Sequence, residues 1–333
     1  MTSRRVCSLV VACLLSASIA WPSLQAQERA GSPRAGWTVP RTSWGHPRIE
    51  GDYTNKDEAN TPLERPAQLA GRDLTHFTDA ELAELVKQRQ AVARQVASGI
   101  GGAETGAGPT HWYDHLAAKG SRPWFIVDPP EGAIPPFTPA AARREAAVAA
   151  LNSARNGEGR ADSWNDRSLY DRCITRGIPG SMMPTIYGNA YQIVQTPDTI
   201  AIRYEMIHET RIIPLDGRPH LRPGIRQYLG DARGRWEGTT LVVETTNFTD
   251  RTHFGYNDRY NSERQKLVER FTPSGPNQLT WQVTIDDPDT YTRQWTFAMT
   301  LTRDDTQQVF EYACHEGNYG LLHILEAARA EEK

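Results

Sequence analysis

Residues 278–303, QLTWQVTIDDPDTYTRQWTFAMTLTR, contain two runs in which every second residue is apolar. The apolar positions are Leu279, Trp281, Val283 and Ile285 in the first run, and Trp295, Phe297, Met299 and Leu301 in the second. A period of two is typical of a strand with one buried face. The sequence 286–289, DDPD, is typical of a turn. The stretch therefore predicts two antiparallel strands that share a core.

The same alternation continues N-terminal to this stretch. Ile200, Ile202, Tyr204 and Met206 alternate with Ala201, Arg203, Glu205 and Ile207. Further predicted strands cover 191–195, 211–215, 240–247, 266–271 and 309–314. About seven or eight sequential antiparallel strands must curl or close to cover their edges. The expected fold is therefore α+β and mainly β, an antiparallel meander that closes into a lipocalin-like barrel or a bent sandwich.

The chain divides by composition into three parts. Residues 1–26 form a predicted signal peptide, and residues 27–165 form a Pro- and Gly-rich N-terminal region with two helices. The first helix begins at Thr78, which forms a capping box with Glu81, and the second begins after Thr138. Residues 166–333 form the antiparallel β domain, which ends in a helix over 319–331.

The first 26 residues have the three zones of a secretory signal peptide. Arg4 and Arg5 precede an apolar run over 6–20, and small residues precede a predicted cleavage after Ala26. The apolar run is shorter than the roughly 20 residues that span a bilayer. We therefore expect a periplasmic or secreted protein with no integral membrane segment after cleavage.

The charge balance limits the expected partners. The chain has 37 Lys and Arg against 40 Asp and Glu, a formal net charge of −3. Such a balance does not provide the basic surface that binds nucleic acid or anionic lipid. The expected partner is a small-molecule ligand rather than a nucleic acid.

Cysteine usage predicts one disulfide. Of the four cysteines, Cys7 and Cys13 leave with the signal peptide, so Cys173 and Cys314 remain. In an oxidising compartment two such residues pair. The bond would close a long loop and stabilise the fold by about 4 kcal/mol in the chain-entropy model.

Several segments together resemble one family. They are 61–66 (TPLERP), 126–130 (IVDPP), 173–177 (CITRG), 211–220, 234–238 (GRWEG) and 312–319 (YACHEGNY). They resemble a widespread family of exported bacterial proteins of soil and environmental genomes for which no activity is known. The resemblance implies secretion and a single co-folded unit. It implies no substrate and no catalytic residue.

Two histidines are the candidate proton carriers. His208 continues the apolar parity of residues 200–206, so an unbroken strand would direct its imidazole into the core, near Glu205. His315 and Glu316 follow Cys314 at a predicted strand-to-helix junction, where a general acid or base could be held. Both sites also have structural interpretations, as a paired core histidine and as a junction.

The candidate ligand-binding residues have less specific signals. They are Arg211, His220, Arg235, Trp236 and Asn318. Arginine forks suit carboxylates or phosphates, and salt bridges to nearby acids are the alternative. Asn318 is alternatively the cap of the last helix.

No recognised metal-binding spacing is present, so we expect no metal and no cofactor. Zinc stays an open alternative, since the chain holds enough nitrogen and oxygen ligands for it. These ligands are His208, His220, His253 and His315 with Glu205, Glu237 or Glu316.

These residues suggest an exported enzyme that holds a small polar molecule in the barrel mouth. His208 and His315 would carry protons, Glu316 or Glu205 would orient them, and the reaction would be that of a lyase, isomerase or hydrolase without a cofactor. A binding barrel without turnover is the alternative function. An envelope scaffold that uses the Pro-rich region is the third.

Overall fold

The structure, a computed structural model, describes residues 36–100, 118–153, 161–185, 187–252, 254 and 261–331. The predicted signal peptide and His253 lie outside these residues. Among the residues described, no helix has both the length and the apolar composition that crossing a bilayer requires.

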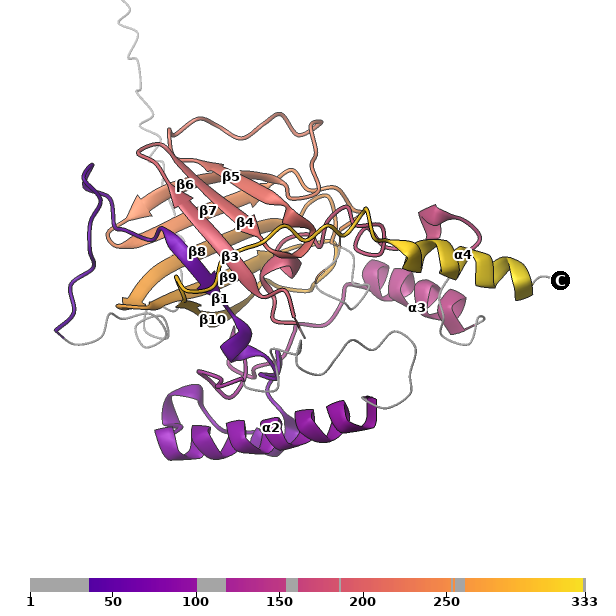
Figure 1. The fold of residues 1–333 in the computed structure, drawn as a ribbon, viewed down its shortest axis with the longest axis horizontal. Helices are drawn as coiled ribbons and strands as arrows, with labels where there is room; N and C mark the ends of the chain where they lie inside the picture. Colours follow the sequence, from indigo (N-terminus) through magenta and orange to yellow (C-terminus); the bar gives the residue numbers. More distant parts are fainter. Residues whose placement is uncertain are drawn as a thin grey trace, which may run out of the picture.

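One antiparallel sheet organises the molecule (Figure 1). Its strands are β1 Gly51–Thr54, β2 Ile126–Asp128, β3 Ala190–Gln195, β4 Thr199–Tyr204, β5 Thr210–Pro214, β6 Asp231–Glu237, β7 Thr240–Thr246, β8 Lys266–Gly275, β9 Gln278–Asp286 and β10 Trp295–Arg303. Their order is β5-β4-β3-β1-β10-β9-β8-β7-β6, and β2 pairs with β10 off this path. The antiparallel meander predicted from the alternation is confirmed.

The two ends of the sheet approach each other, so the barrel is nearly closed. Strands β5 and β6 contact one another but have no hydrogen-bonded register. Gly234 on β6 makes the approach possible, because a Cβ there would fall 2.9 Å from a methyl of Ile213 and still closer to Leu215. A larger residue at position 234 would push the two edges apart.

Aromatic side chains fill the core. All eight apolar positions of the two runs in 278–303 are buried, as predicted. Trp281 on β9 packs edge-on against Phe297 on β10, with ring centroids 5.5 Å apart, and stacks on Phe271 of β8 at 6.3 Å. The centre of the barrel is thus occupied by the protein's own rings.

The N-terminal region contributes to this sheet. Strand β1 lies between β3 and β10, and β2 pairs with a different part of the same edge of β10, opposite β9. Neither strand is evident in the sequence, because runs of four and three residues are too short to display a period of two.

In the described part of the chain, three α-helices lie outside the barrel at the positions expected from their caps. They are α2 Asp79–Ile100, α3 Pro139–Ser153 and α4 Tyr319–Glu331. The capping box of α2 is present: Thr78 N–H donates to Glu81 Oε2 at 2.9 Å, and Glu81 N–H donates to Thr78 Oγ1 at 3.2 Å. In Figure 1, α2 lies below the barrel and α4 projects from its side.

One predicted strand is wrong. Residues 309–314 have no strand, and Phe310 in this segment is exposed. Strand β10 already has β9, β1 and β2 as neighbours, so the chain that follows it cannot pair with β10. Alternation alone does not reveal whether a free sheet edge is available.

Candidate functional site

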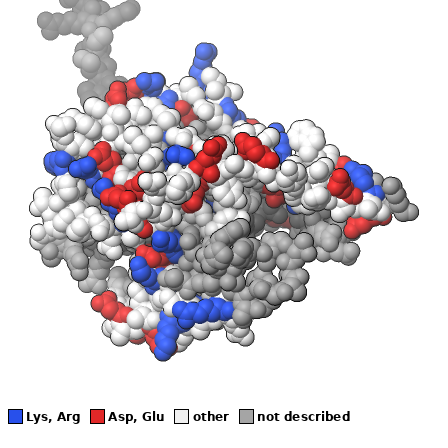
Figure 2. All heavy atoms as spheres, viewed as in Figure 1, with Lys and Arg blue, Asp and Glu red and all other residues white. Residues whose placement is uncertain are grey.

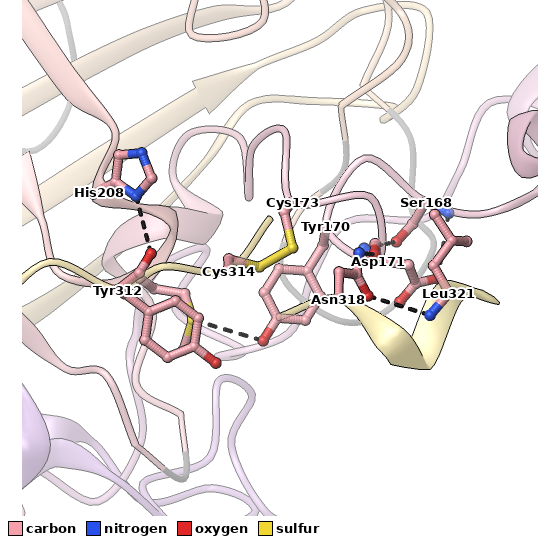
Figure 3. Close-up of a disulfide and its surroundings, with 10 residues drawn as sticks. Ser168, Tyr170, Asp171, Cys173, His208, Tyr312, Cys314, Asn318 and Leu321 are labelled. Carbon is pink, nitrogen blue, oxygen red and sulfur yellow. Dashed lines mark hydrogen bonds between the residues drawn. A yellow bond between two sulfur atoms is a disulfide. The ribbon is translucent and has the colours of Figure 1, made fainter. Parts of the chain in front are cut away.

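The predicted pairing of Cys173 with Cys314 is confirmed, and this disulfide forms the centre of the candidate site (Figure 3). The two Cα atoms lie 5.6 Å apart although 141 positions separate them in the sequence. The bond connects the loop before β3 to the segment between β10 and α4. We call residues 170–176, 205–209 and 312–318 the disulfide junction.

Asn318 has a structural role in the junction. Its Nδ2 donates to the carbonyl oxygen of Asp171 at 2.7 Å, and its Oδ1 accepts from Leu321 N–H at 3.2 Å (Figure 3). The second contact is an N-cap of α4, which was the alternative interpretation from the sequence. Both ends of the amide are therefore used by the backbone.

His208 lies outside the barrel, which corrects the expectation that its imidazole points inward. Strand β4 ends at Tyr204, and the chain turns so that Ile207 has φ 65° and His208 has φ 51°. The parity of the strand is lost at this turn, and the His208 side chain is exposed.

The His208 ring is nevertheless fixed in orientation. Its Nδ1 lies 2.9 Å from the carbonyl oxygen of Tyr312 (Figure 3). A carbonyl oxygen can only accept, so Nδ1 carries the hydrogen, and in the neutral ring the lone pair is then on Nε2. The same carbonyl oxygen also accepts from Cys314 N–H at 2.8 Å. The tautomer of His208 is thus set by a backbone atom two residues from the disulfide.

Backbone strain accompanies this arrangement. A left-handed conformation is rare for a β-branched residue such as Ile207, and Cys173 also has a positive φ, 55°. Such residues cost about 1–3 kcal/mol each and persist only where their surroundings enforce them. Such residues occur preferentially at functional sites, so the strain supports the junction as the candidate site over other parts of the surface.

Glu209 is a residue that sequence reasoning missed. Its Oε2 accepts from Thr175 Oγ1 at 2.7 Å, and the side chain is half-buried. Burial raises the pKa of Glu209 from 4.5 to about 7, against the hydrogen bond from Thr175, which lowers it. The burial comes from a loop 34 positions away, and no local pattern in the sequence signals it.

The other predicted acid–base residues lie in the junction with different surroundings. Glu205 accepts from Ala190 N–H at 3.1 Å, which ties it to the start of β3. His315 and Glu316 are exposed, and the ring contact of His208 goes to Tyr312 rather than to either of them. The predicted convergence of two imidazoles inside the barrel does not occur.

Arg211, predicted as a ligand anchor, is instead inside the barrel. It is 3% exposed, and its Nη2 lies 2.5 Å from Glu269 Oε2 and 2.6 Å from Thr245 Oγ1. Trp281 Nε1 donates to the other oxygen of Glu269 at 3.1 Å. Burial lowers the pKa of Arg211, and the neighbouring Glu269 carboxylate reverses that effect and raises it overall. The pair is a buried internal contact of β5 with β8.

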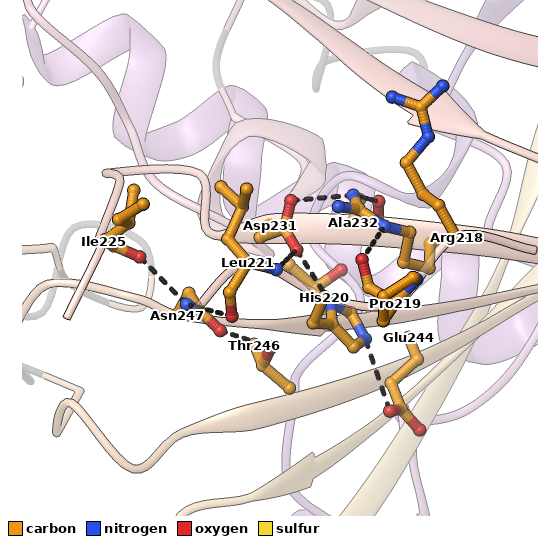
Figure 4. Close-up of polar contacts among 12 residues, drawn as sticks. Arg218, Pro219, His220, Leu221, Ile225, Asp231, Ala232, Glu244, Thr246 and Asn247 are labelled. Atoms are coloured by element: carbon orange, nitrogen blue, oxygen red, sulfur yellow. Dashed lines mark hydrogen bonds and ion pairs between the residues drawn. The ribbon is translucent and has the colours of Figure 1, made fainter. Parts of the chain in front are cut away.

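His220 forms a charged cluster on the outer wall (Figure 4). Its Nδ1 lies 2.9 Å from Asp231 and its Nε2 lies 3.4 Å from Glu244. Arg233 pairs with Asp231 at 2.7 Å, and Lys266 pairs with Glu244 at 2.6 Å. Both ring nitrogens therefore face carboxylates, and we call these five residues the His220 cluster.

The remaining predicted ligand residues lie on β6. Arg235 pairs with Glu237 at 2.8 Å and is exposed. Trp236 is half-buried, and its ring centroid lies 5.6 Å from that of His46. The structure brings His208, Glu205, His315, Glu316 and Asn318 together at the disulfide junction and places the rest elsewhere.

No cofactor site can be assigned from the side chains. Within the described ranges, no three His, Cys, Asp or Glu side chains are grouped so that they could hold a metal ion. Acidic and basic side chains intermix on the face shown in Figure 2. The chemistry that the junction can perform with its own groups is proton transfer.

Comparison with known proteins adds little to this description. Neither a protein-family model nor a curated protein matches the chain. One solved structure is similar, that of a secretary abundant heat soluble (SAHS) protein from Ramazzottius varieornatus, with 11% identity and a TM-score of 0.24. The match covers 42% of this chain and 89% of that one. A TM-score this low supports no conclusion about fold or function.

Proposed function

We propose that the protein is an exported enzyme that performs acid–base chemistry on a small polar molecule at the disulfide junction. The reaction class is that of a lyase, isomerase or hydrolase that works by proton transfer. His208 is the proton carrier, and Glu209 is a second acid–base group. The substrate binds outside the barrel, since aromatic side chains occupy its centre.

One observation carries the proposal: an exposed imidazole whose Nδ1 lies within hydrogen-bond distance of a backbone carbonyl oxygen. A general base needs a lone pair that is accessible and correctly aimed. The carbonyl oxygen of Tyr312 orients the ring by accepting from Nδ1, and the exposure of the side chain makes Nε2 accessible. The left-handed backbone at His208 keeps the ring away from the core.

Glu209 supports the proposal through its pKa. A carboxyl group with a pKa of about 7 is present in both protonation states at neutral pH. A catalytic acid works best when its pKa lies near the operating pH. His208 as acceptor and protonated Glu209 as donor could therefore serve the two halves of one proton-transfer reaction.

The disulfide supports export. Disulfides of this kind persist in oxidising compartments such as the periplasm, and Cys173 and Cys314 are bonded. Expression of the full chain in a bacterium tests this point. The N-terminal sequence of the protein recovered from the periplasm is expected to begin at Gln27.

The activity is tested by incubating the mature chain with a defined mixture of esters, glycosides, hydroxy acids and keto sugars. Mass spectrometry then identifies any compound that is consumed. We expect His208→Asn to slow the turnover by about 100-fold or more, because asparagine tolerates the left-handed backbone but is no base at neutral pH.

The matched control is His323→Asn, which changes an exposed histidine of α4 and is expected to leave the rate unchanged. Turnover that survives His208→Asn would contradict the assignment of His208. Binding of a compound without its conversion would instead favour a non-catalytic binding protein.

A further inference from the structure

The disulfide and the His208 ring share one backbone atom. The carbonyl oxygen of Tyr312 accepts from Cys314 N–H at 2.8 Å and from His208 Nδ1 at 2.9 Å. Cys314 is in turn bonded to Cys173, which lies in the loop before β3. Three segments that are distant in sequence therefore meet within a few bonds of the imidazole (Figure 3).

The segment that carries Tyr312 has no sheet partner of its own. Residues 308–313 have no helix or strand, so backbone pairing does not fix the position of the Tyr312 carbonyl. The covalent bond at Cys314 lies two positions away. It restricts the carbonyl to a small volume, because two residues span at most about 7 Å.

The disulfide also holds the loop that contacts Glu209, the residue after His208. Thr175 lies two positions after Cys173 and donates to Glu209 Oε2 at 2.7 Å. His208 and Glu209 thus each contact a residue within two positions of one of the bonded cysteines. Both half-cystines are half-buried rather than enclosed, so a small dithiol can approach the bond.

We infer that the Cys173–Cys314 bond is the positioning element of the His208 imidazole and that a dithiol reductant switches the site off. The expected loss of turnover rests on the proposed function. The positioning of the ring by the disulfide does not depend on it. In the step itself a dithiol is oxidised to its own disulfide. Cys173 and Cys314 each gain one electron and one proton and separate as thiols.

The consequence for His208 is a change of tautomer. With the Tyr312 carbonyl in place, Nδ1–H is favoured by the hydrogen bond, by about fivefold to tenfold. When the carbonyl moves away, nothing in the described contacts of the ring favours Nδ1–H. A larger share of the molecules then carries the hydrogen on Nε2, and in these molecules the ring cannot act as a base at that atom.

The test is nuclear magnetic resonance of the full mature chain labelled with ¹⁵N histidine. The His208 signals are identified by their absence in His208→Asn. In the oxidised protein we expect ring nitrogen shifts of the Nδ1–H tautomer. Dithiothreitol is expected to reduce the ratio of the Nδ1–H tautomer to the Nε2–H tautomer by about fivefold, and oxidised glutathione is expected to restore it.

The controls lie on the same chain. The signals of His220 and His323, and the indole signals of the buried tryptophans, are expected to stay in place on reduction. A Cys173→Ser/Cys314→Ser variant, which keeps side chains of similar size without the bond, is expected to give the same His208 signals as the reduced protein.

Two results would overturn the inference. The first is a His208 tautomer that is unchanged in the folded, reduced chain and in the variant. The second is loss of the whole fold on reduction and in the variant, because the bond would then support the barrel rather than the ring. Failure of the proposed function would look different: the redox-dependent tautomer would be present, and no compound would be turned over.

Discussion

His208 and His220 occupy opposite kinds of surroundings, although the sequence marks both as site residues. Among the described residues, the His208 ring has one hydrogen-bond partner, a backbone carbonyl, and it lies on a strained turn beside the disulfide. The His220 ring has two carboxylate partners, and these are paired with Arg233 and Lys266. The His208 ring can therefore transfer a proton at Nε2, whereas both nitrogens of the His220 ring are used in contacts that stabilise the fold.

The His220 cluster has an identifiable structural task. Residues 215–230 connect β5 to β6, the two strands that meet without a hydrogen-bonded register. His220 ties this connection to β6 through Asp231 and to β7 through Glu244. The contrast therefore predicts that changes at the cluster alter stability, while changes at the junction alter activity.

Removal of the disulfide is expected to have the largest effect on stability. For Cys173→Ser/Cys314→Ser, the closed loop of 141 positions predicts a loss of about 4 to 5 kcal/mol in the free energy of unfolding. Guanidinium denaturation followed by tryptophan fluorescence measures it. A loss below about 1 kcal/mol would show that the junction is held by its other contacts.

The second largest effect is a pH dependence of stability due to Glu209. Its folded pKa of about 7 exceeds the ordinary value of 4.5, so the folded chain keeps a proton that the unfolded chain releases between these values. Stability therefore falls as the pH rises from about 4.5 to 7. Glu209→Gln removes the buried charge and is expected to exceed the wild type by roughly 2 kcal/mol at pH 8.

At pH 4 the Glu209→Gln variant and the wild type are expected to have equal stability, since both side chains are then neutral. Glu316→Gln, at an exposed position of the same junction, is the control. If the unfolding free energies of the wild type and Glu209→Gln change in parallel between pH 4 and 8, the pKa of Glu209 is not raised in the folded protein.

A smaller effect separates the two histidines directly. His220→Asn leaves Asp231, a buried residue, with fewer donors, and a loss of about 1 to 2 kcal/mol in unfolding free energy is expected. His208→Asn changes an exposed ring and is expected to cost less than about 0.5 kcal/mol. Urea denaturation of both variants measures the difference. Equal losses would remove the distinction between the two regions.

A further effect concerns Asn247, which also holds the β5–β6 connection. Its Nδ2 donates to the carbonyl oxygens of Leu221, Arg222 and Ile225 at 2.9–3.2 Å, and its φ is 59° (Figure 4). Asn247→Gly keeps the backbone angle but loses the three contacts, so a loss of about 1 kcal/mol is expected. Asn247→Ala adds the cost of a left-handed alanine, roughly 1 kcal/mol more.

Hydrogen exchange provides a second measurement for Asn247. Amides of 221–230 are expected to exchange faster in Asn247→Gly, while those of β9 and β10 keep their rates. Faster exchange throughout the barrel would mean that Asn247 supports the whole fold rather than the connection.

The sequence predicts the sheet well where side chains alternate over six or more positions. Strands β4, β9 and β10 display this pattern because one face of each is buried against the aromatic core. The helices are predicted by their caps, Thr78 and Thr138, whose contacts are local. Strands β1 and β2 are missed because their position depends on distant partners.

The candidate site is less predictable than the sheet. The cysteine pair is predicted from compartment and number, but the turn at Ile207 and His208 is not, since no proline or glycine marks it. One turn moves the imidazole from the interior to the surface. Glu209 is missed for a related reason, because its burial comes from a loop that is distant in sequence.

The place of β1 in the sheet also affects how the chain assembles. Residues 51–54 need residues 190–193 on one side and residues 302–303 on the other. During synthesis the second of these partners emerges long after β1 itself. The contacts of β1 are therefore non-local, which slows folding. The growing chain cannot complete its sheet until β10 has been made.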